Sequence, residues 1–291
     1  MDTSTASDPV VVGVDGSPAG DAALRWAVDE AHGRLAPLCV VHALDQRHSE
    51  AFIRANPGFV AVERRAAEEV LDAAVGRARA LVADVDVRPV LAVGPPAVVM
   101  LRQAAAAGLV VLGSRGRGGF SGLLLGSTSL HVARHAACPV VVLRSAGADA
   151  VPAPGRILVG TDGSSSSEGA LRFAFAQARR RGRGLTALYA WSSPAIYVDV
   201  PGCGKWEQAA KEEQATLSEV LAPWHNRYPD VDVVEKTVLG HAATLLIDES
   251  AGGELLVVGS RGRGGFRGLL LGSVSHAALQ HAHCPVAVVR H

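Results

Sequence analysis

The chain is poor in cysteine and in aromatic residues, and it has no excess of either charge. Its 291 residues include four cysteines, and aromatic residues make up 4% of the total. Lysine plus arginine number 28, as do aspartate plus glutamate. Because no overall field then drives the chain toward nucleic acid or an anionic bilayer, we expect no nucleic-acid partner.

Long apolar runs are also missing. No run approaches the roughly 18 residues that a membrane-spanning helix needs, so we expect no membrane insertion. Residues 1–8 contain no basic segment followed by an apolar core, and they do not resemble a secretory signal. Cys39 and Cys203 have no counterparts in the repeat described below, and scattered thiols are typical of a reducing cytosol. Together these features predict a cytoplasmic protein.

What the chain does contain is a long internal repeat. The stretch 113–129 returns as 259–275 with changes at two positions. Asp15, which follows an apolar run and precedes a glycine, corresponds to Asp162 at an offset of 147. The chain is therefore a tandem duplication, which we divide into a first domain of residues 1–147 and a second of residues 148–291.

Each copy contains alternating strand and helix signals. The apolar runs are continuous, as expected for strands buried on both faces, and five alternating units predict a parallel sheet wrapped by helices. Ser17-Pro18 provides an N-cap and a favoured first helical residue. We expect Gly33 to end that first helix and the segment around Asn56-Pro57-Gly58 to be irregular. The expected strands are 10–14, 38–43, 87–93, 109–112 and 140–143, then 157–161, 185–190, 231–239, 255–258 and 286–290.

The repeated stretch is a glycine-rich loop between a strand and a helix. In parallel sheets, ligands bind at the carboxyl ends of strands where the connection direction reverses. Glycines let backbone N–H groups approach an anion, and the following helix adds its dipole. The serine that opens this helix would either cap it or donate to a phosphate. We therefore predict phosphate contacts from Gly113, Gly116, Gly126 and Ser127, and from Gly259, Gly262, Gly272 and Ser273.

An aspartate ends the first apolar run of each copy. Asp15 and Asp162 would lie at the rim of the sheet, where a carboxylate accepts hydrogen bonds from ribose hydroxyls or an adenine amino group. Asp-Gly-Ser is also good turn chemistry, so a purely structural role is an alternative. Gly13 and Gly160, two positions before the aspartates, are assigned to the same candidate site.

Two arginines lie inside each glycine-rich loop. The sequence allows charge-assisted contacts to the outer phosphates, and it equally allows a solvated surface position, where ion pairs contribute little. The residues are Arg115 and Arg117 in the first copy and Arg261 and Arg263 in the second.

The loops match neither of the two common phosphate-binding motifs. They lack the Gly-Lys-Ser/Thr ending of a Walker motif and the Gly-x-Gly-x-x-Gly of a Rossmann fingerprint. The pattern Gly-x2-Gly-x9-Gly-Ser, present at 113–127 and 259–273, resembles the ATP-binding signature of the universal stress protein family. The resemblance extends over 10–144 and 156–290 and includes both aspartates.

This resemblance implies two tandem Rossmann-like domains, each a five-stranded parallel sheet with helices on both faces. It also implies that each domain binds ATP, with or without Mg²⁺, and that domains pair through their last strands. Adenine-side backbone contacts would fall near Ala43 and Ala190, and Thr128 and Val274 would lie within reach of the phosphates. A homodimer and regulatory protein partners, which the sequence does not identify, are expected on the same ground.

We expect an ATP-binding regulator of stress response or dormancy that is not primarily an enzyme. Neither loop contains an Asp, Glu or His to hold a metal or act as a base, so at most weak ATP hydrolysis is expected. The alternatives are an ATP-hydrolysing or adenylyl-transferring enzyme, and an interaction module without nucleotide. No metal site is expected, because the helical spacing of His131, His135 and Cys138 is broken in the second copy by Ala277.

Overall fold

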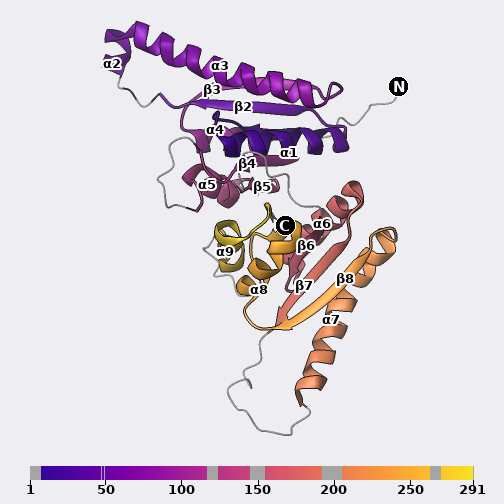
Figure 1. The fold of residues 1–291 in the computed structure, drawn as a ribbon. Helices are drawn as coiled ribbons and strands as arrows, with labels where there is room; N and C mark the ends of the chain where they lie inside the picture. The colour runs from indigo at the N-terminus through magenta and orange to yellow at the C-terminus, as the bar shows by residue number, and fades with distance from the viewer. Residues whose placement is uncertain are drawn as a thin grey trace. The chain divides into compact units, whose positions relative to one another are not determined.

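The computed structural model describes residues 8–46, 48, 50–116, 124–144, 155–191, 205–262 and 270–290. The chain divides into two compact units, residues 1–150 and 151–291. Each unit contains a parallel sheet covered by helices (Figure 1), so the expected α/β fold is confirmed. No helix in the described ranges is long and apolar enough to cross a membrane.

Unit 1 is built on the strands β1 (Val10–Gly13), β2 (Leu38–Leu44), β3 (Val87–Val93), β4 (Leu109–Gly113) and β5 (Val140–Leu143). They are parallel and lie in the order β3-β2-β1-β4-β5. The chain runs outward from β1 to β3 and then returns to the other side of β1. The strand order therefore reverses between β1 and β4, which is where open parallel sheets bind ligands.

Unit 2 repeats this topology. Its strands are β6 (Arg156–Thr161), β7 (Leu185–Trp191), β8 (Val233–Leu239), β9 (Gly253–Gly259) and β10 (Val286–Val289). They lie in the order β8-β7-β6-β9-β10 and are again parallel. The reversal point in this unit is between β6 and β9.

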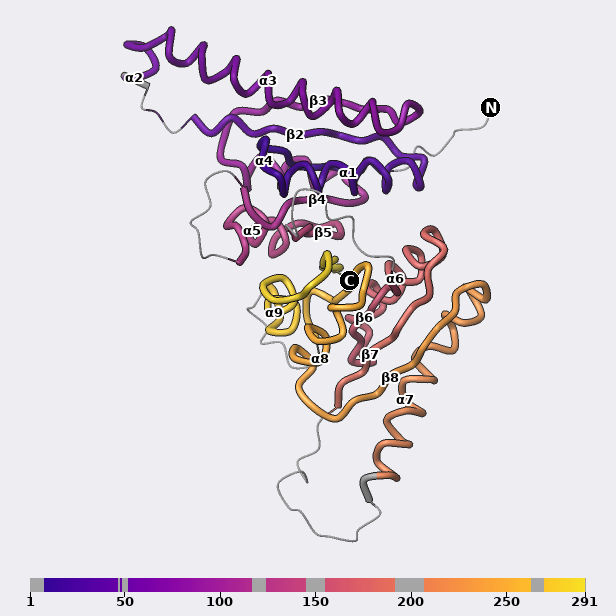
Figure 2. The backbone as a smooth tube through the Cα atoms, in the orientation of Figure 1, coloured from indigo at the N-terminus to yellow at the C-terminus, as the bar shows by residue number. Residues whose placement is uncertain are grey.

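Helices cover both faces of each sheet. In unit 1, α1 (Pro18–Arg34) and α3 (Pro57–Leu81), which follows α2 (Glu50–Ala55), pack on one face, and α4 (Pro96–Ala104) and α5 (Ser127–His135) on the other. Figure 2 traces α3 alongside β2 and β3. In unit 2, α6 (Glu168–Arg181) and α7 (Lys205–Arg227) share one face, opposite α8 (Ala242–Glu249) and α9 (Ser273–His281). Short 3-10 turns, η1 (Ser165–Ser167) and η3 (Ser250–Gly252), precede α6 and follow α8.

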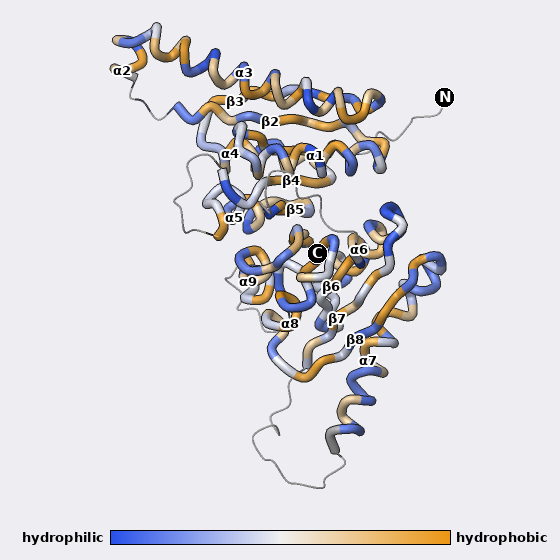
Figure 3. Tube along the Cα trace, in the orientation of Figure 1, coloured by the Kyte–Doolittle hydropathy of each residue, from blue (hydrophilic) through white to orange (hydrophobic). Residues whose placement is uncertain are grey.

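Burial explains the two kinds of sequence pattern. Val10–Val12 and Leu109–Leu112 are buried on both faces, which is why their sequences are continuous apolar runs. By contrast, α3 alternates between hydrophobic and hydrophilic along its length (Figure 3). Only its stripe of Ala67, Leu71, Ala74, Val75 and Ala78 is buried.

In each unit, the edge strand next to the second strand of the repeat is less apolar than the centre. β3 lies at an edge of the unit 1 sheet and carries Pro89 as its third residue, opposite Val40 of β2. β8 lies at the edge of unit 2 and carries Glu235 and Lys236, and the Lys236 ammonium forms an ion pair with Glu249. Proline lacks an N–H, so within sheets it is confined to such edges.

Two local expectations are wrong. Gly33 does not end α1: the helix continues to Arg34 and is capped by Leu35, which adopts left-handed angles (φ 52°, ψ 42°) and donates its N–H to carbonyls of the last turn. The segment around Asn56 is helical, because α2 ends at Ala55 and α3 begins at Pro57. Proline is favoured at a first helical position, where its missing N–H has no intrahelical partner to lose.

Replacing Gly113 by alanine should destabilise unit 1. The new Cβ would lie 2.7 Å from the carbonyl carbon and oxygen of Ala19, so α1 would have to move off β4, and such overpacking costs about 1–3 kcal/mol. The matched control is Gly76→Ala in α3, where nothing lies within 4 Å of the new Cβ. This change should stabilise the helix by about 0.5–1 kcal/mol.

Urea unfolding followed by circular dichroism distinguishes the two variants. The midpoint should fall for Gly113→Ala and rise for Gly76→Ala. Shifts of the same sign and size would contradict the close packing of α1 on β4.

Candidate functional site

Each unit has a cavity at the carboxyl ends of its strands, where the strand order reverses. The cavity volumes are about 820 Å³ in unit 1 and 690 Å³ in unit 2, within the usual range for small-molecule sites. The predicted residues that line them are Gly13, Asp15, Ala43, Gly113, Arg115, Gly116, Gly126, Ser127 and Thr128 in unit 1, and Gly160, Asp162, Ala190, Gly259, Arg261, Gly262, Gly272, Ser273 and Val274 in unit 2. Arg117 and Arg263 fall outside the described residues.

The Asp15 carboxylate lies between two segments of the site. Its Oδ1 accepts the Ser17 N–H at 3.0 Å and the Ser17 hydroxyl at 2.5 Å. The Ser17 Oγ in turn accepts the Gly20 N–H at 3.1 Å, as the N-cap of α1. On the other side, Oδ2 faces the glycine-rich loop, where a Cβ on Gly116 would lie 2.5 Å from it. The turn role that the sequence allowed is therefore present, and it uses the oxygen turned away from the loop.

Asp162 repeats this geometry in unit 2. Its Oδ1 accepts the Ser164 N–H at 3.0 Å and the Ser164 hydroxyl at 2.6 Å. A Cβ on Gly262 would lie 3.0 Å from Oδ2. Both units thus bring the first-strand aspartate and the fourth-strand loop together.

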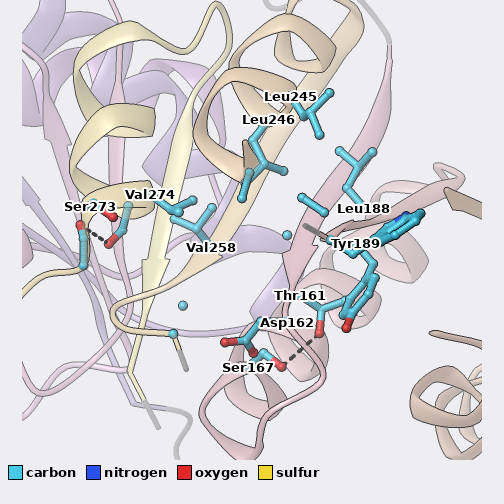
Figure 4. A pocket seen from close by; sticks show the side chains of 18 of the residues that line it. Thr161, Asp162, Ser167, Leu188, Tyr189, Leu245, Leu246, Val258, Ser273 and Val274 are labelled. Carbon is cyan, nitrogen blue, oxygen red and sulfur yellow. Dashed lines mark hydrogen bonds between the residues drawn. The ribbon is translucent and has the colours of Figure 1, made fainter. Parts of the chain in front are cut away.

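A cluster of hydroxyl groups distinguishes unit 2 at this point. Thr161 Oγ1 and Ser167 Oγ lie 2.9 Å apart, and Thr161 Oγ1 also accepts the Gly163 N–H at 3.1 Å. Figure 4 shows Thr161, Asp162 and Ser167 together on one wall of the cavity. Unit 1 has Val14 at the position of Thr161, so this wall is more polar in unit 2.

The helix after each loop begins without a side-chain cap. Gly126 is the N-cap of α5 and Ser127 its first residue, and Gly272 and Ser273 have the same places in α9. The loop is closed by the backbone, because the Gly126 N–H donates to the Ser114 carbonyl at 2.6 Å. Of the two roles that the sequence allowed for these serines, capping the helix is therefore wrong. Both serines are exposed at the cavities.

The glycines of the strands admit other parts of the protein. A Cβ on Gly13 would lie 2.6 Å from Leu112 Cδ2, and one on Gly160 would lie 2.8 Å from Leu246 Cδ1. Gly113 makes room for Ala19, as described above. The expectation that Gly113 clears space for a phosphate is therefore corrected, since that space is taken by α1.

Positive charge is present at both cavities. Arg115 and Arg261 are exposed and line the cavity of their unit. Burial and the neighbouring Arg261 lower the pKa of Arg290. Arg261 is therefore a cationic group at the unit 2 cavity, where it would favour an anion nearby.

The opposite end of each cavity is formed by residues that the sequence did not single out. In unit 1, the His42 Nδ1 donates to the Val14 carbonyl at 2.7 Å, since a carbonyl only accepts. In unit 2, Figure 4 shows Leu188 and Tyr189 across the cavity from Ser273. Other residues that line the cavities are Asp45, Pro95, Pro96, Ala97 and Met100 in unit 1, and Trp191, Glu213, Val238, Leu245 and Leu246 in unit 2. His131 also lines the unit 1 cavity, from α5, one helical turn after Ser127.

One signal could have identified part of this wall. His42 and Tyr189 occupy the same position in the second strand of each unit, one residue before the alanines that the sequence assigned to the site. Glu213 has no such signal, because it lies far along the chain, in the middle of α7.

No metal centre is present in the part of the chain that the structure describes: no group of three or more His, Cys, Asp or Glu side chains is placed to hold an ion. The His131 and His135 rings stack on each other with centroids 4.2 Å apart. Burial raises the pKa of Cys138 to about 11, which keeps this thiol protonated and a poor ligand at neutral pH.

The chain matches known proteins along its whole length. The model of the universal stress protein family matches residues 7–144 and 154–290. Universal stress proteins Rv2005c and Rv2623 of Mycobacterium tuberculosis are 41% and 38% identical to it, over 97% and 100% of this chain and 96% and 99% of theirs. A solved universal stress protein from Archaeoglobus fulgidus has the same fold, with a TM-score of 0.70 at 20% identity over 98% of this chain and 97% of that chain. The chain therefore belongs to the universal stress protein family, with two family domains in tandem.

Proposed function

We propose that both cavities bind ATP and that the bound nucleotide makes this protein a regulator of stress response or dormancy. The observation that carries the proposal is the placement of Asp15 and Asp162 against Gly116 and Gly262. It puts a carboxylate, an acceptor for ribose hydroxyls, beside a loop suited to phosphates. The arrangement occurs twice in one chain.

The phosphates would lie on the loop side of each cavity. There the exposed Ser127 and Ser273 open helices whose first N–H groups and dipoles favour negative charge. Arg115 and Arg261 add cationic side chains at the same end. The base would lie toward Ala43 and Ala190 at the ends of the second strands.

Regulation fits the site better than catalysis. His131 lies one helical turn after Ser127 and lines the unit 1 cavity, but unit 2 has Ala277 at the corresponding position. A proton-transferring group at the phosphate end is therefore not a shared property of the duplicated site. We propose weak ATP hydrolysis at most, with or without Mg²⁺ beside the aspartates.

We further propose that the protein acts in the cytoplasm as a homodimer and passes its nucleotide state to protein partners. Two domains per chain and the symmetry of most soluble oligomers support this. Size-exclusion chromatography with light scattering, with and without ATP, tests the assembly.

Freshly purified protein should release intact ATP when it is denatured by heat. Chromatography of the supernatant identifies the nucleotide, and calorimetric titration of nucleotide-free protein should give two ATP per chain. ADP or AMP accompanied by turnover would favour the enzyme alternative. The absence of any nucleotide, with no calorimetric binding, would favour the interaction module.

Asp15→Ala combined with Asp162→Ala should weaken ATP binding at each site roughly ten- to a hundredfold, since hydrogen bonds to a charged group contribute about 1.5–3 kcal/mol. Removing a negative charge acts in the opposite direction, because ATP is an anion, so the loss should fall toward the lower bound. Calorimetry measures both the affinity and the stoichiometry.

Asparagine at both positions separates the ligand role from the turn role. An Asn oxygen still accepts the Ser17 and Ser164 N–H groups, while the amide NH2 replaces the oxygen that faces the loop. The asparagine variant should therefore keep its unfolding midpoint and still lose ATP affinity. Unchanged ATP titrations of folded double variants would refute the assigned role.

A further inference from the structure

The two cavities differ in chemistry at the end away from the glycine-rich loop. In unit 2, Tyr189 lies there, across the cavity from Ser273 (Figure 4), and Trp191 and Glu213 also line this cavity. The strand registers show that His42 and Leu44 occupy the positions in unit 1 that Tyr189 and Trp191 occupy in unit 2. The two copies of the repeat therefore share the glycine-rich loop and differ in the residues at the opposite end of the cavity.

Glu213 lies on the apolar side of its helix. It precedes the fully buried Leu217 and Leu221 at intervals of four residues along α7, which places all three on one face. The counterparts of the two leucines on α3 are Leu71 and Val75, so the counterpart of Glu213 is Ala67, which is 4% exposed. A carboxylate thus stands where unit 1 has a core alanine.

This carboxylate is half-buried at the cavity, and the residues that the structure describes give it no partner. Within the described ranges, Glu213 makes no hydrogen bond or ion pair, whereas the next residue, Gln214, donates to Glu235 at 2.9 Å. A charged group taken partly out of water is unfavourable unless a donor faces it. An ionised carboxylate only accepts, so a ligand group that displaces water from it has to donate in order to be favourable there.

Tyr189 and Trp191 lie on the same side of the sheet as Glu213. Gly160 faces Leu246 of α8, and the register places Leu188 beside Gly160. Because side chains alternate along a strand, Tyr189 and Trp191 point to the opposite face, which α6 and α7 cover. Both are largely buried, with 5% and 9% of their surface exposed. Aromatic rings are favourable surfaces for a planar base.

We propose that the unit 2 cavity is selective for a nucleotide whose base carries an exocyclic amino group, which donates to the Glu213 carboxylate while the base lies against Trp191. The inference rests on the proposed nucleotide function and adds base selectivity to one of the two sites. Adenine carries such an amino group, and hypoxanthine carries a carbonyl oxygen in its place. Unit 1 has His42 and Asp45 at its corresponding end, so the test must report on unit 2 alone.

Trp191 provides that readout, because it lines the unit 2 cavity and the described lining of the unit 1 cavity contains no tryptophan. ATP and ITP are titrated into nucleotide-free full-length protein while tryptophan fluorescence is followed. ITP should bind unit 2 roughly ten- to a hundredfold more weakly than ATP, as expected for a hydrogen bond to a charged acceptor that is lost. Trp191→Leu, which copies Leu44, should abolish the signal while calorimetry still detects unit 1.

Glu213→Gln tests the acceptor itself. A glutamine side chain can donate to the hypoxanthine oxygen or accept from the adenine amino group, so the preference for ATP over ITP should shrink to within about threefold. Glu219→Gln is the matched control, because Glu219 is exposed on the same helix and does not line the cavity. This control should keep the full preference.

Three results would overturn the inference. Equal unit 2 affinities for ATP and ITP would show that the base amino group is not read, while leaving the proposed nucleotide function intact. If calorimetry detected binding at two sites while Trp191 fluorescence did not change, the base would not lie against Trp191. No binding of ATP by either method would reject both the inference and the proposed function.

Discussion

One carboxylate in each unit determines the shape of the candidate site. Asp15 Oδ1 is held by the turn that starts α1, so Oδ2 cannot leave the loop without disturbing the cap of that helix. Asp162 is held in the same way by Ser164. The site therefore depends on short hydrogen bonds at the end of a buried strand. A side chain on Gly116 would collide with the carboxylate, and one on Gly262 would crowd it. Rigid positioning of this kind costs little entropy, because the groups involved are already fixed by the fold.

The frame of the fold could be predicted from the sequence because its signals are local and occur twice. The apolar run at Val10–Val12 is a central strand, and Ser17-Pro18 begins α1 with the expected cap. The end of α1 could not be predicted in this way. Glycine is the usual residue in a left-handed cap, yet Leu35 takes this conformation, and tertiary context decides such cases. The helical segment around Asn56 was missed because Pro and Gly signal both loops and helix starts.

The candidate site was predictable on one side only. The aspartates and loop glycines stand out as sequence motifs, and the structure places them in one cavity per unit. The opposite wall is assembled by tertiary packing, since Glu213 reaches the cavity from α7 and Leu246 from α8. No short pattern connects these residues, and only the repeat alignment shows that Glu213 replaces an alanine of the core. The contacts predicted for Arg117 and Arg263 stay predictions, as do the occupancy of the cavities and the identity of any partner.

Pro89 within β3 limits how unit 1 can be recognised by other chains. Sheet augmentation by an incoming strand needs a continuous row of backbone donors and acceptors, and a proline interrupts that row. In unit 2, the charged residues Glu235 and Lys236 at the centre of β8 disfavour the addition of a strand at that edge. Growth of amyloid-like ladders from these two edges is disfavoured for the same reason. A protein partner that approached either of these two edges would then have to bind through side-chain contacts and not by adding a strand.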